Sequence, residues 1–289
     1  MSWRTVVITK TAKLDYSMGY MVVRDVESTA KIHISEISVL VVESTAVSVT
    51  AALLNELINK KVKVIFCDDK HNPSFELTPY YGSHDCSLKL KRQISWNKTV
   101  KQFVWTQIVV EKIKNQAAVL DYYKLEQSSQ LMEYIEEIEL NDKTNREGHA
   151  AKVYFNALFG KGFSRSDDCP VNAALNYGYS IILSIFNREV AASGYLTQLG
   201  LFHDNMFNQY NLSCDLMEPF RPFVDLTVRE MNPMKFDKEE KLQIYAMLSE
   251  EIRIDGRTQT FINAIKIYCK SIFAAIEEND ISLIRFACR

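Results

Sequence analysis

The sequence lacks the features that place a chain in a membrane or outside the cell. Among its 289 residues, no apolar run approaches the roughly 18 residues that a membrane-spanning helix needs. The first ten residues, MSWRTVVITK, contain no long apolar core of the kind found in signal peptides. We therefore expect a cytoplasmic protein that has no membrane partner.

Paired cysteines are also missing. None of the six cysteines belongs to a C-x-x-C pair, which argues against a zinc site of that kind. Their scatter along a chain of this length is typical of reduced thiols rather than of a disulfide framework. The cysteines are Cys67, Cys86, Cys169, Cys214, Cys269 and Cys288.

The chain has no large excess of charge of either sign. Its formal net charge is −2, so no overall positive field attracts it to nucleic acid. Locally, however, seven basic residues lie between Lys89 and Lys114, opposed only by Glu111. This run fits a solvated helix face or a surface that follows DNA phosphates. Trp96 and Trp105 lie within it, and their helical spacing favours the core over base stacking.

What is present is the composition of a globular protein with a substantial core, 47% hydrophobic and 24% charged. The first eighty residues contain short runs rich in Val, Ile and Tyr, separated by polar or Gly breaks, which predict strands. A helix is expected at residues 48–61, with Ser48 as its N-cap. The predicted strands are residues 4–9, 12–16, 19–25, 30–34, 37–42 and 62–68.

Beyond about Ser87 the apolar residues recur every three or four positions, which predicts helices. Residues 88–123 contain no Gly or Pro and are expected to form one long helix, and Gly160 occupies a helix C-cap position. The sequence predicts an α+β fold: a small N-terminal β-rich domain (1–82) and a larger all-α C-terminal domain (87–289). The other predicted helices are residues 125–140, 145–160, 171–193, 222–231, 238–251 and 257–279.

A few acidic and histidine residues are candidates for chemistry, although each also has a structural interpretation. Asp215 and Glu218 form an Asp-x-x-Glu pattern that resembles a capping box, yet the same spacing puts both carboxylates on one side of a helix. Glu147 fits a helix first turn, where the dipole favours an acid. His203 alone fits a hydrogen-bonded interior histidine. His149 points away from Glu147 on a helix and is expected at the surface.

Four stretches together resemble a known family. Residues 111–116, 146–155, 167–182 and 200–225 are similar, in order and spacing, to the CRISPR-associated adaptation integrase, the first-numbered protein of CRISPR systems. The β-then-α layout agrees with that family's architecture. The stretch EGHAAKVYFNALFG and the short chain look most like the type II version.

The resemblance implies a divalent-metal site with Glu147, His203 and Glu218 as ligands. It places Asp215 beside the site, either as a second catalytic carboxylate or as an acid outside the metal's ligands, and Arg221 as the ion-pair partner of a carboxylate. Two carboxylates and one imidazole suit Mg²⁺ or Mn²⁺ and leave coordination positions open for substrate.

Two further groups of residues are candidates for the neighbourhood of the site. Tyr177 could place a hydroxyl near it, although a core aromatic with a satisfied hydroxyl is the alternative. The basic run and the KGFSR loop could touch DNA phosphates. The DNA-contact candidates are Lys89, Lys91, Arg92, Lys161 and Arg165.

The implied reaction is CRISPR spacer acquisition. A short prespacer duplex is joined to the leader–repeat DNA of the CRISPR array through its 3′-hydroxyl. No ATP motif is visible, and none is needed when one phosphodiester is exchanged for another. If water were the nucleophile, the same site would make a stand-alone endonuclease for branched DNA. A non-catalytic scaffold that bridges DNA is the third possibility.

The resemblance also implies an assembly. Homodimers form through the β domain, and two of them bridge a dimer of a second, ferredoxin-like adaptation subunit in a 4:2 complex. In type II systems the RNA-guided effector nuclease and a ring-forming subunit also take part.

Overall fold

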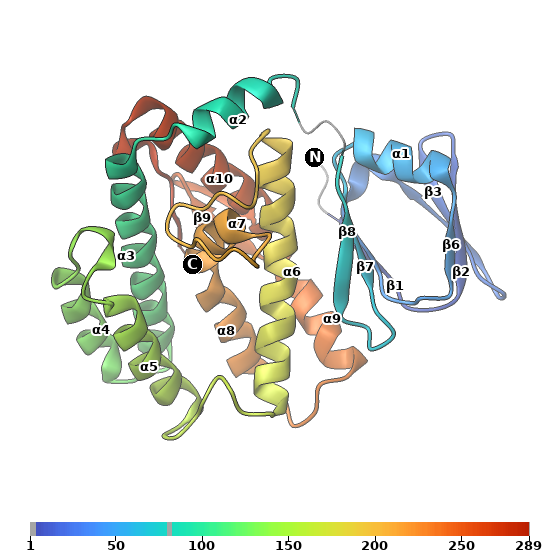
Figure 1. The fold of residues 1–289 in the computed structure, drawn as a ribbon. Coiled ribbons are helices and arrows are strands. Elements are labelled where there is room, and N and C mark those ends of the chain that lie inside the picture. Colours follow the sequence, from blue (N-terminus) through green and yellow to red (C-terminus); the bar gives the residue numbers. More distant parts are fainter. Residues whose placement is uncertain (1–3, 80–82, 289) are drawn as a thin grey trace. The chain divides into compact units, whose positions relative to one another are not determined.

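The computed structural model describes residues 4–79 and 83–288 and divides the chain into two compact units, Met1–Ser83 and His84–Arg289 (Figure 1). The first unit consists mainly of strands and the second mainly of helices. The predicted α+β class is therefore confirmed. Residues 80–82, at the end of the predicted N-terminal domain, lie outside the described residues.

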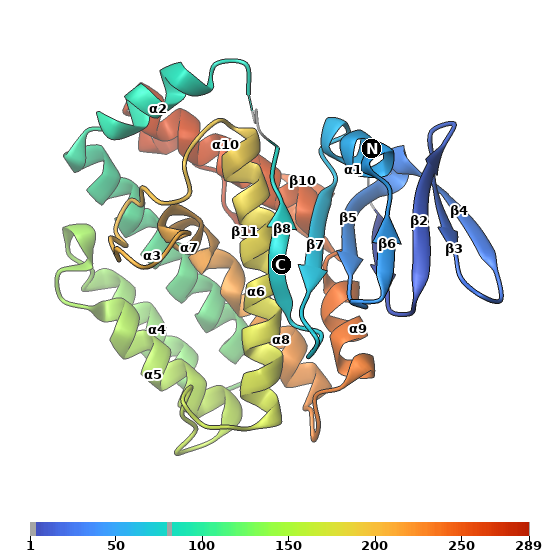
Figure 2. The same ribbon diagram turned by 45° about the vertical axis from the view of Figure 1, so that its right-hand side comes forward.

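The first unit contains two four-stranded sheets and one helix (Figure 2). In the first sheet the order is β1 (Arg4–Ile8), β5 (Ile37–Val42), β7 (Lys63–Cys67) and β8 (Pro73–Leu77), and only β8 is antiparallel to its neighbour. In the second sheet the order is β4 (Thr29–His33), β3 (Tyr20–Arg24), β2 (Ala12–Ser17) and β6 (Val47–Val49). A short 3₁₀ turn, η1 (Ile34–Glu36), precedes β5.

One apolar core joins both sheets to helix α1 (Ala51–Asn59). Leu14 from the second sheet, Leu40 from the first and Leu53 from α1 are fully buried in it. All six residues of β5 are buried, which explains why ISVLVV is continuously apolar instead of alternating. The predicted cap at Ser48 is wrong: that residue lies in β6, and the Thr50 hydroxyl accepts the Leu53 N–H.

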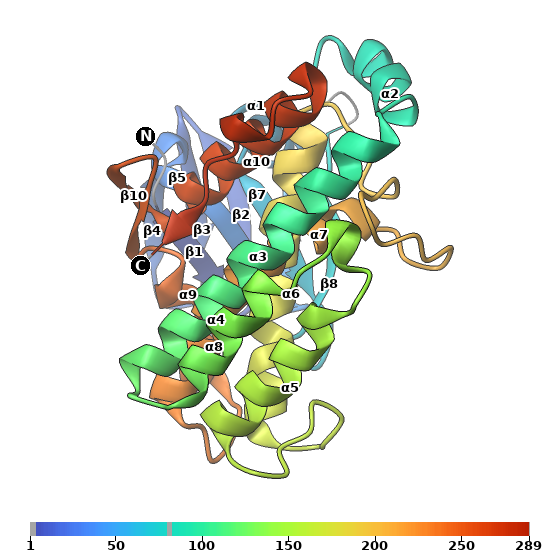
Figure 3. The same ribbon diagram turned by 90° about the vertical axis from the view of Figure 1, so that its left-hand side faces the viewer.

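The second unit consists mostly of helices. Helix α3 packs against α4, α5, α8 and α10, and α6 packs against α7, α8, α9 and α10 (Figure 3). The glycine cap predicted at Gly160 is confirmed, with a φ of 105°. The helices are α2 (Cys86–Ile94), α3 (Lys98–Tyr122), α4 (Gln127–Glu136), α5 (Arg146–Phe159), α6 (Pro170–Ala192), α7 (Asn211–Met217), α8 (Arg221–Met231), α9 (Lys238–Met247) and α10 (Phe261–Glu278). The 3₁₀ turns are η2 (Leu140–Asp142), η3 (Glu218–Phe220) and η4 (Ile281–Leu283).

The single helix predicted over residues 88–123 is wrong, because α2 ends at Ile94 and a separate helix, α3, begins at Lys98. Asn97 caps α3: its side-chain oxygen accepts the Thr99 N–H at 2.8 Å and the Val100 N–H at 3.4 Å. An asparagine at this position satisfies donors that the first turn of a helix leaves unpaired. The polar side chain thus starts a new helix without any glycine or proline.

The second unit also contains a small sheet that was not predicted, and residues 257–260 of it lie within the helix expected at residues 257–279. Its strands run in the order β10 (Arg257–Thr260), β9 (Glu251–Ile254) and β11 (Ala287–Cys288). Asp255 and Gly256 make the turn between β9 and β10. The unit is therefore predominantly helical rather than all-α. Across the described ranges, no helix is both long and apolar enough to span a bilayer.

Candidate functional site

The centre of the candidate site is a buried lysine held by two glutamates. The Lys112 ammonium, on α3, donates to Glu147 Oε1 on α5 at 2.5 Å and also to Glu218 Oε2 on η3. Two oxygens at hydrogen-bond distance from one nitrogen lie within about 6 Å of each other. The fold thus brings together two of the three carboxylates that the sequence singled out.

The start of α5 fixes Glu147 in the first turn of that helix. The Asp142 carboxylate accepts the Arg146 N–H at 2.8 Å and the Glu147 N–H at 3.1 Å, so it satisfies donors that the helix leaves unpaired. Gly148 lets the chain pass closely here, because a Cβ would lie 2.8 Å from the Asn145 side chain. The Glu147 side chain is 23% exposed, so the site opens to solvent on this side.

Glu218 is positioned from both sides. It is 3% exposed, and Arg221 Nε lies 2.8 Å from its Oε1, while Lys112 holds Oε2. The Asn115 side chain donates to the Pro219 carbonyl at 2.9 Å, which ties η3 to α3. Because both carboxylate oxygens are engaged, the orientation of Glu218 is set before any ligand arrives.

Asp215 orients the histidine. Its carboxylate is fully buried and accepts three backbone N–H groups, those of Leu201 (2.6 Å), Phe202 (3.1 Å) and His203 (3.1 Å). The same carboxylate lies 2.6 Å from His203 Nδ1, so Nε2 is the ring nitrogen left for a ligand. Asp215 lies inside α7, and Glu218 begins η3. The capping-box interpretation is therefore wrong, because the Asp215 carboxylate accepts N–H groups of the loop at residues 201–203 and not those of a helix N-terminus.

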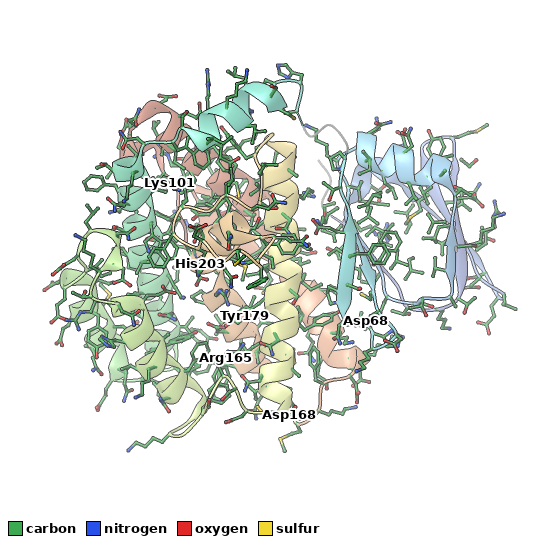
Figure 4. All side chains as sticks on the ribbon, viewed as in Figure 1. Asp68, Lys101, Arg165, Asp168, Tyr179 and His203 are labelled. Atoms are coloured by element: carbon green, nitrogen blue, oxygen red, sulfur yellow. The ribbon has the colours of Figure 1, made fainter. Side chains whose placement is uncertain are left out.

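Close packing holds the loop that carries His203. A Cβ on Gly200 would lie 2.3 Å from the His203 carbonyl oxygen and 2.8 Å from Asp215 Oδ2. Trp105, fully buried on α3, stacks on Phe202 with 4.5 Å between ring centroids. It also meets the His203 ring edge-to-face, with 5.8 Å between centroids. The core position predicted for Trp105 is therefore confirmed. Figure 4 shows His203 amid the helices of the second unit.

The electrostatics agree with this proximity. The hydrogen bond to Asp215 raises the pKa of His203, and the nearby charges of Glu218 and Glu147 raise it further against the opposing effect of burial. Burial alone would lower the pKa of Lys112, but the two glutamates outweigh it and raise that pKa. Burial alone would raise the pKa of Glu218, yet the adjacent cations lower it.

Tyr177 has the environment of the alternative interpretation, a core aromatic with a satisfied hydroxyl, and Tyr179 is the tyrosine that contacts Arg221. The Tyr177 hydroxyl hydrogen bonds to that of Tyr245, and its ring contacts Phe236 at 5.4 Å. Tyr179 instead lies under the Arg221 guanidinium, 4.7 Å from carbon Cζ to the ring centroid. Figure 4 shows Tyr179 between His203 and Arg165.

The Tyr179 hydroxyl donates to Asp225, a carboxylate that is only 1% exposed. Burial raises the pKa of Asp225 to about 6, against the lowering effect of its tyrosine partners. Tyr179 therefore joins Arg221, and through it Glu218, to a buried acid on α8.

The predicted DNA-contact residues lie in two places, α2 and the loop after α5. Lys91 and Lys161 are exposed. Arg92 pairs with Glu277 at 2.8 Å, and Lys89 lies 3.5 Å from Asp85. Arg165 donates to Asn172 and Asn176 and contacts the Tyr179 ring at 5.4 Å. His149 is exposed, as expected.

The predicted ligands have the donor atoms that a divalent ion requires, but they are not arranged around a common centre. Within residues 4–79 and 83–288, no three His, Cys, Asp or Glu side chains are already arranged as a metal site, and Lys112 lies between two of the predicted ligands. The donors nevertheless fit: they are two carboxylates and an imidazole. The other ring nitrogen of that imidazole is held by a carboxylate, which fixes the ring orientation as in many metal-binding histidines. The metal assignment stays a prediction.

Comparison with known proteins adds the family. A family model described as CRISPR associated protein Cas1 matches residues 5–255. The chain belongs to the Cas1 family. A Cas1 relative from Neisseria meningitidis serogroup C (strain 8013), named a CRISPR-associated endonuclease, is 34% identical over 97% of this chain and 94% of its own length. One from Pyrobaculum aerophilum, with the same function in its name, is 28% identical over 82% and 86%.

Solved structures share the fold of this Cas1-family chain. A casposase bound to its integration product has a TM-score of 0.77 at 15% identity, covering 97% of this chain and 92% of that one. A Cas1 protein from Thermotoga maritima has a TM-score of 0.75 at 16% identity, covering 95% and 97%. A Cas6-RT-Cas1–Cas2 complex scores 0.72 at 15% identity, covering 97% of this chain and 36% of that one. The resemblance seen in four sequence stretches is thereby confirmed.

Proposed function

We propose that this Cas1-family protein is a metal-dependent DNA integrase that joins prespacer DNA to a CRISPR array. The observation that carries the proposal is the convergence of Glu147 and Glu218 on the Lys112 ammonium, with His203 held by Asp215 close enough for both glutamates to raise the histidine pKa. Family membership supports it, as do relatives named endonucleases and the fold shared with a casposase bound to an integration product.

The proposed metal ligands are Glu147, His203 and Glu218, binding Mg²⁺ or Mn²⁺. A bound divalent ion would polarise a phosphodiester and stabilise the leaving oxygen. The chain's own residues prepare the site. Asp215 fixes the imidazole so that Nε2 is presented, and Arg221 holds one oxygen of Glu218. Because these contacts already hold His203 and Glu218, neither side chain has to reorient when DNA binds.

The reaction follows from which nucleophile the bound DNA supplies. The 3′-hydroxyl oxygen of the prespacer attacks a phosphorus atom of the array strand and loses its proton. The bond from that phosphorus to the array 3′-oxygen breaks, and this oxygen leaves as a new hydroxyl. One phosphodiester replaces another, so no nucleotide cofactor is consumed.

The proposed DNA path includes the exposed Lys91 and Lys161, which can reach phosphates without giving up an ion pair. Lys89, Arg92 and Arg165 belong to the same path but must exchange their present partners for phosphate. The proposed assembly is a homodimer through the β domain, with two dimers bridging a dimer of a ferredoxin-like subunit. The fold shared with a chain of a Cas6-RT-Cas1–Cas2 complex supports such a partner.

We also propose the type II version of the family. The stretch of residues 147–160 and the similarity to the Neisseria meningitidis relative support this assignment. The RNA-guided effector nuclease and a ring-forming subunit would then be further partners.

The test is an integration assay with Glu147→Gln, His203→Ala and Glu218→Gln, in Mg²⁺ and in Mn²⁺, with and without the ferredoxin-like subunit. Glutamine keeps the shape of the side chain but removes the charge. We expect each variant to lose at least about 100-fold in joining rate while DNA binding is retained. The control is His149→Ala, an exposed histidine on the same helix as Glu147, which should integrate normally.

A prespacer with a 3′-dideoxy end separates the proposed reaction from hydrolysis. Strand transfer stops without the hydroxyl, whereas cleavage by water continues and would favour the stand-alone endonuclease. The scaffold hypothesis treats Asp215 and Glu218 as an N-terminal capping box, whereas Asp215 lies inside α7 and the Glu218 side chain pairs with Lys112 and Arg221. Wild-type integration rates in all three variants would contradict the proposed ligands.

A further inference from the structure

Lys112 is a charged side chain in a place where charges are costly. It is 7% exposed, and its ammonium donates to Glu147 and Glu218. A buried charge of this kind is tolerated only when it is paired and hydrogen bonded. The lysine and the two glutamates therefore depend on one another in the metal-free protein.

The charges around this ammonium are already balanced. Lys112 and Arg221 carry two positive charges, and Glu147 and Glu218 carry two negative charges. A divalent ion bound by the same two glutamates would take the position between the carboxylates that the ammonium now occupies. Two cations at such a distance repel each other strongly in a partly buried site.

The lysine can move away whereas the arginine is held. The Lys112 ammonium sits at the end of a flexible four-carbon chain, and the Glu147 side of the site is open to solvent. Arg221 lies on the Tyr179 ring as well as against Glu218, so its planar group has two partners. The geometry therefore makes Lys112 the cation that a metal displaces.

We propose that Lys112 is an internal competitor of the divalent ion. In the metal-free protein it links the carboxylate on α5 to the one on η3 and so keeps two ligands in place. When a metal binds, the ammonium gives up these contacts. The lysine therefore weakens metal affinity while it stabilises the metal-free fold. This inference rests on the metal site given under the proposed function.

The test is the affinity of the whole protein for Mn²⁺, measured by electron paramagnetic resonance or calorimetry without DNA. Lys112→Met removes the charge at similar length, and Lys114→Met, an exposed position two residues away, is the control. Removing one charge at ion-pair distance should tighten Mn²⁺ binding at least about tenfold. Lys112→Met should melt at a lower temperature than wild type without metal and gain more from added Mn²⁺.

A purely structural role for Lys112 would change the Mn²⁺ affinity of Lys112→Met in the opposite direction. If Lys112 only positioned the glutamates, Lys112→Met would bind Mn²⁺ more weakly than wild type. Unchanged or weaker binding by Lys112→Met, with normal binding by wild type, overturns the proposal. If Lys112→Met does not fold, Lys112→Gln keeps one hydrogen bond to a carboxylate and should still bind Mn²⁺ more tightly than wild type.

His203→Ala distinguishes this inference from the proposed function. If wild-type protein binds Mn²⁺ and His203→Ala does not, the metal site is supported. The Lys112 variants then test only the role of Lys112. If neither protein binds Mn²⁺ at any concentration that saturates comparable sites, the metal site itself fails and the competition fails with it.

Discussion

Replacing Asp215 by asparagine is the sharpest probe of how the histidine is held. Each carboxylate oxygen of Asp215 serves two donors: Oδ2 accepts from Leu201 and Phe202, and Oδ1 accepts from the backbone and Nδ1 of His203. Asparagine has the same shape but only one accepting oxygen. Its amide nitrogen must therefore face one of these pairs of donors.

The expected loss of stability follows from that count. A buried donor without a partner costs about 1–3 kcal/mol. The unfolding free energy should therefore fall by about 2–6 kcal/mol if the amide faces the Leu201 and Phe202 N–H groups, and by about 1–3 kcal/mol if it faces His203, where one N–H loses its acceptor. If the amide group faces His203, it donates to Nδ1 and moves the ring proton to Nε2. That nitrogen is then unable to bind a metal, and metal affinity should fall by roughly 10- to 100-fold.

Urea unfolding followed by circular dichroism measures the first effect, and Mn²⁺ binding measures the second. Asp204→Asn is the matched control, since this exposed acid follows His203 directly and should change stability by less than about 0.5 kcal/mol. If Asp215→Asn unfolded like the control and bound Mn²⁺ like wild type, the assignment of Asp215 as the support of the site would be refuted.

Two further predictions concern groups near the site. Burial raises the pKa of Asp225 to about 6, so the folded chain holds this proton more tightly than the unfolded chain. This contribution to stability is complete below about pH 4 and is lost as the pH rises through 6. Between pH 7 and pH 4, the unfolding free energy of wild type should therefore rise by up to roughly 3 kcal/mol relative to that of Asp225→Asn, as measured by urea unfolding. Parallel plots of unfolding free energy against pH for the two proteins would contradict this. Gly200→Ala places a Cβ 2.3 Å from the His203 carbonyl oxygen, so the loop must move. We expect a loss of about 1–3 kcal/mol in thermal unfolding and an integration rate at least about tenfold lower, whereas an unchanged rate would show that the loop tolerates the shift.

Most of the strands and helices could be predicted because their signals are local. Strands β1 to β5, strand β7 and the Gly160 cap follow from patterns that span only a few residues. Strand β6 overlaps the helix predicted at residues 48–61, and β8 was not predicted. The break before Asn97 was missed because the apolar period continues across it and the only signal is one capping side chain. For the small sheet the sequence does contain a signal, the Asp-Gly pair at residues 255–256, which is typical of a tight hairpin turn. In the structure these residues have the φ values of 52° and 70° that such a turn needs. The helical pattern that follows concealed it.

The site was less accessible from sequence alone. Local spacing favoured a capping box for Asp215 and Glu218, and only the family resemblance joined Glu147 and His203 to them. Lys112 was read as one of a run of basic residues, because its partners lie 35 and 106 positions away. Tertiary contacts of this kind leave no periodic signal in a single sequence.

Tyr179 was missed from the sequence for a related reason. Tyr177 and Tyr179 are two positions apart, so they point to different sides of the helix. Both are buried aromatics with hydrogen-bonded hydroxyls, and nothing in the short stretch NYGY distinguishes the one that faces Arg221. Only the packing of α8 against α6 decides between them.

The wide separation of Lys112, Glu147, His203 and Glu218 along the chain has a consequence during synthesis. A ribosome-bound fragment that ends before the 3₁₀ turn η3 already contains Lys112 and Glu147 but lacks Glu218, so Lys112 has only one of its two carboxylate partners. Such fragments carry no complete centre. Under the proposed function, the nascent chain would gain strand-transfer activity only after η3 has been synthesised.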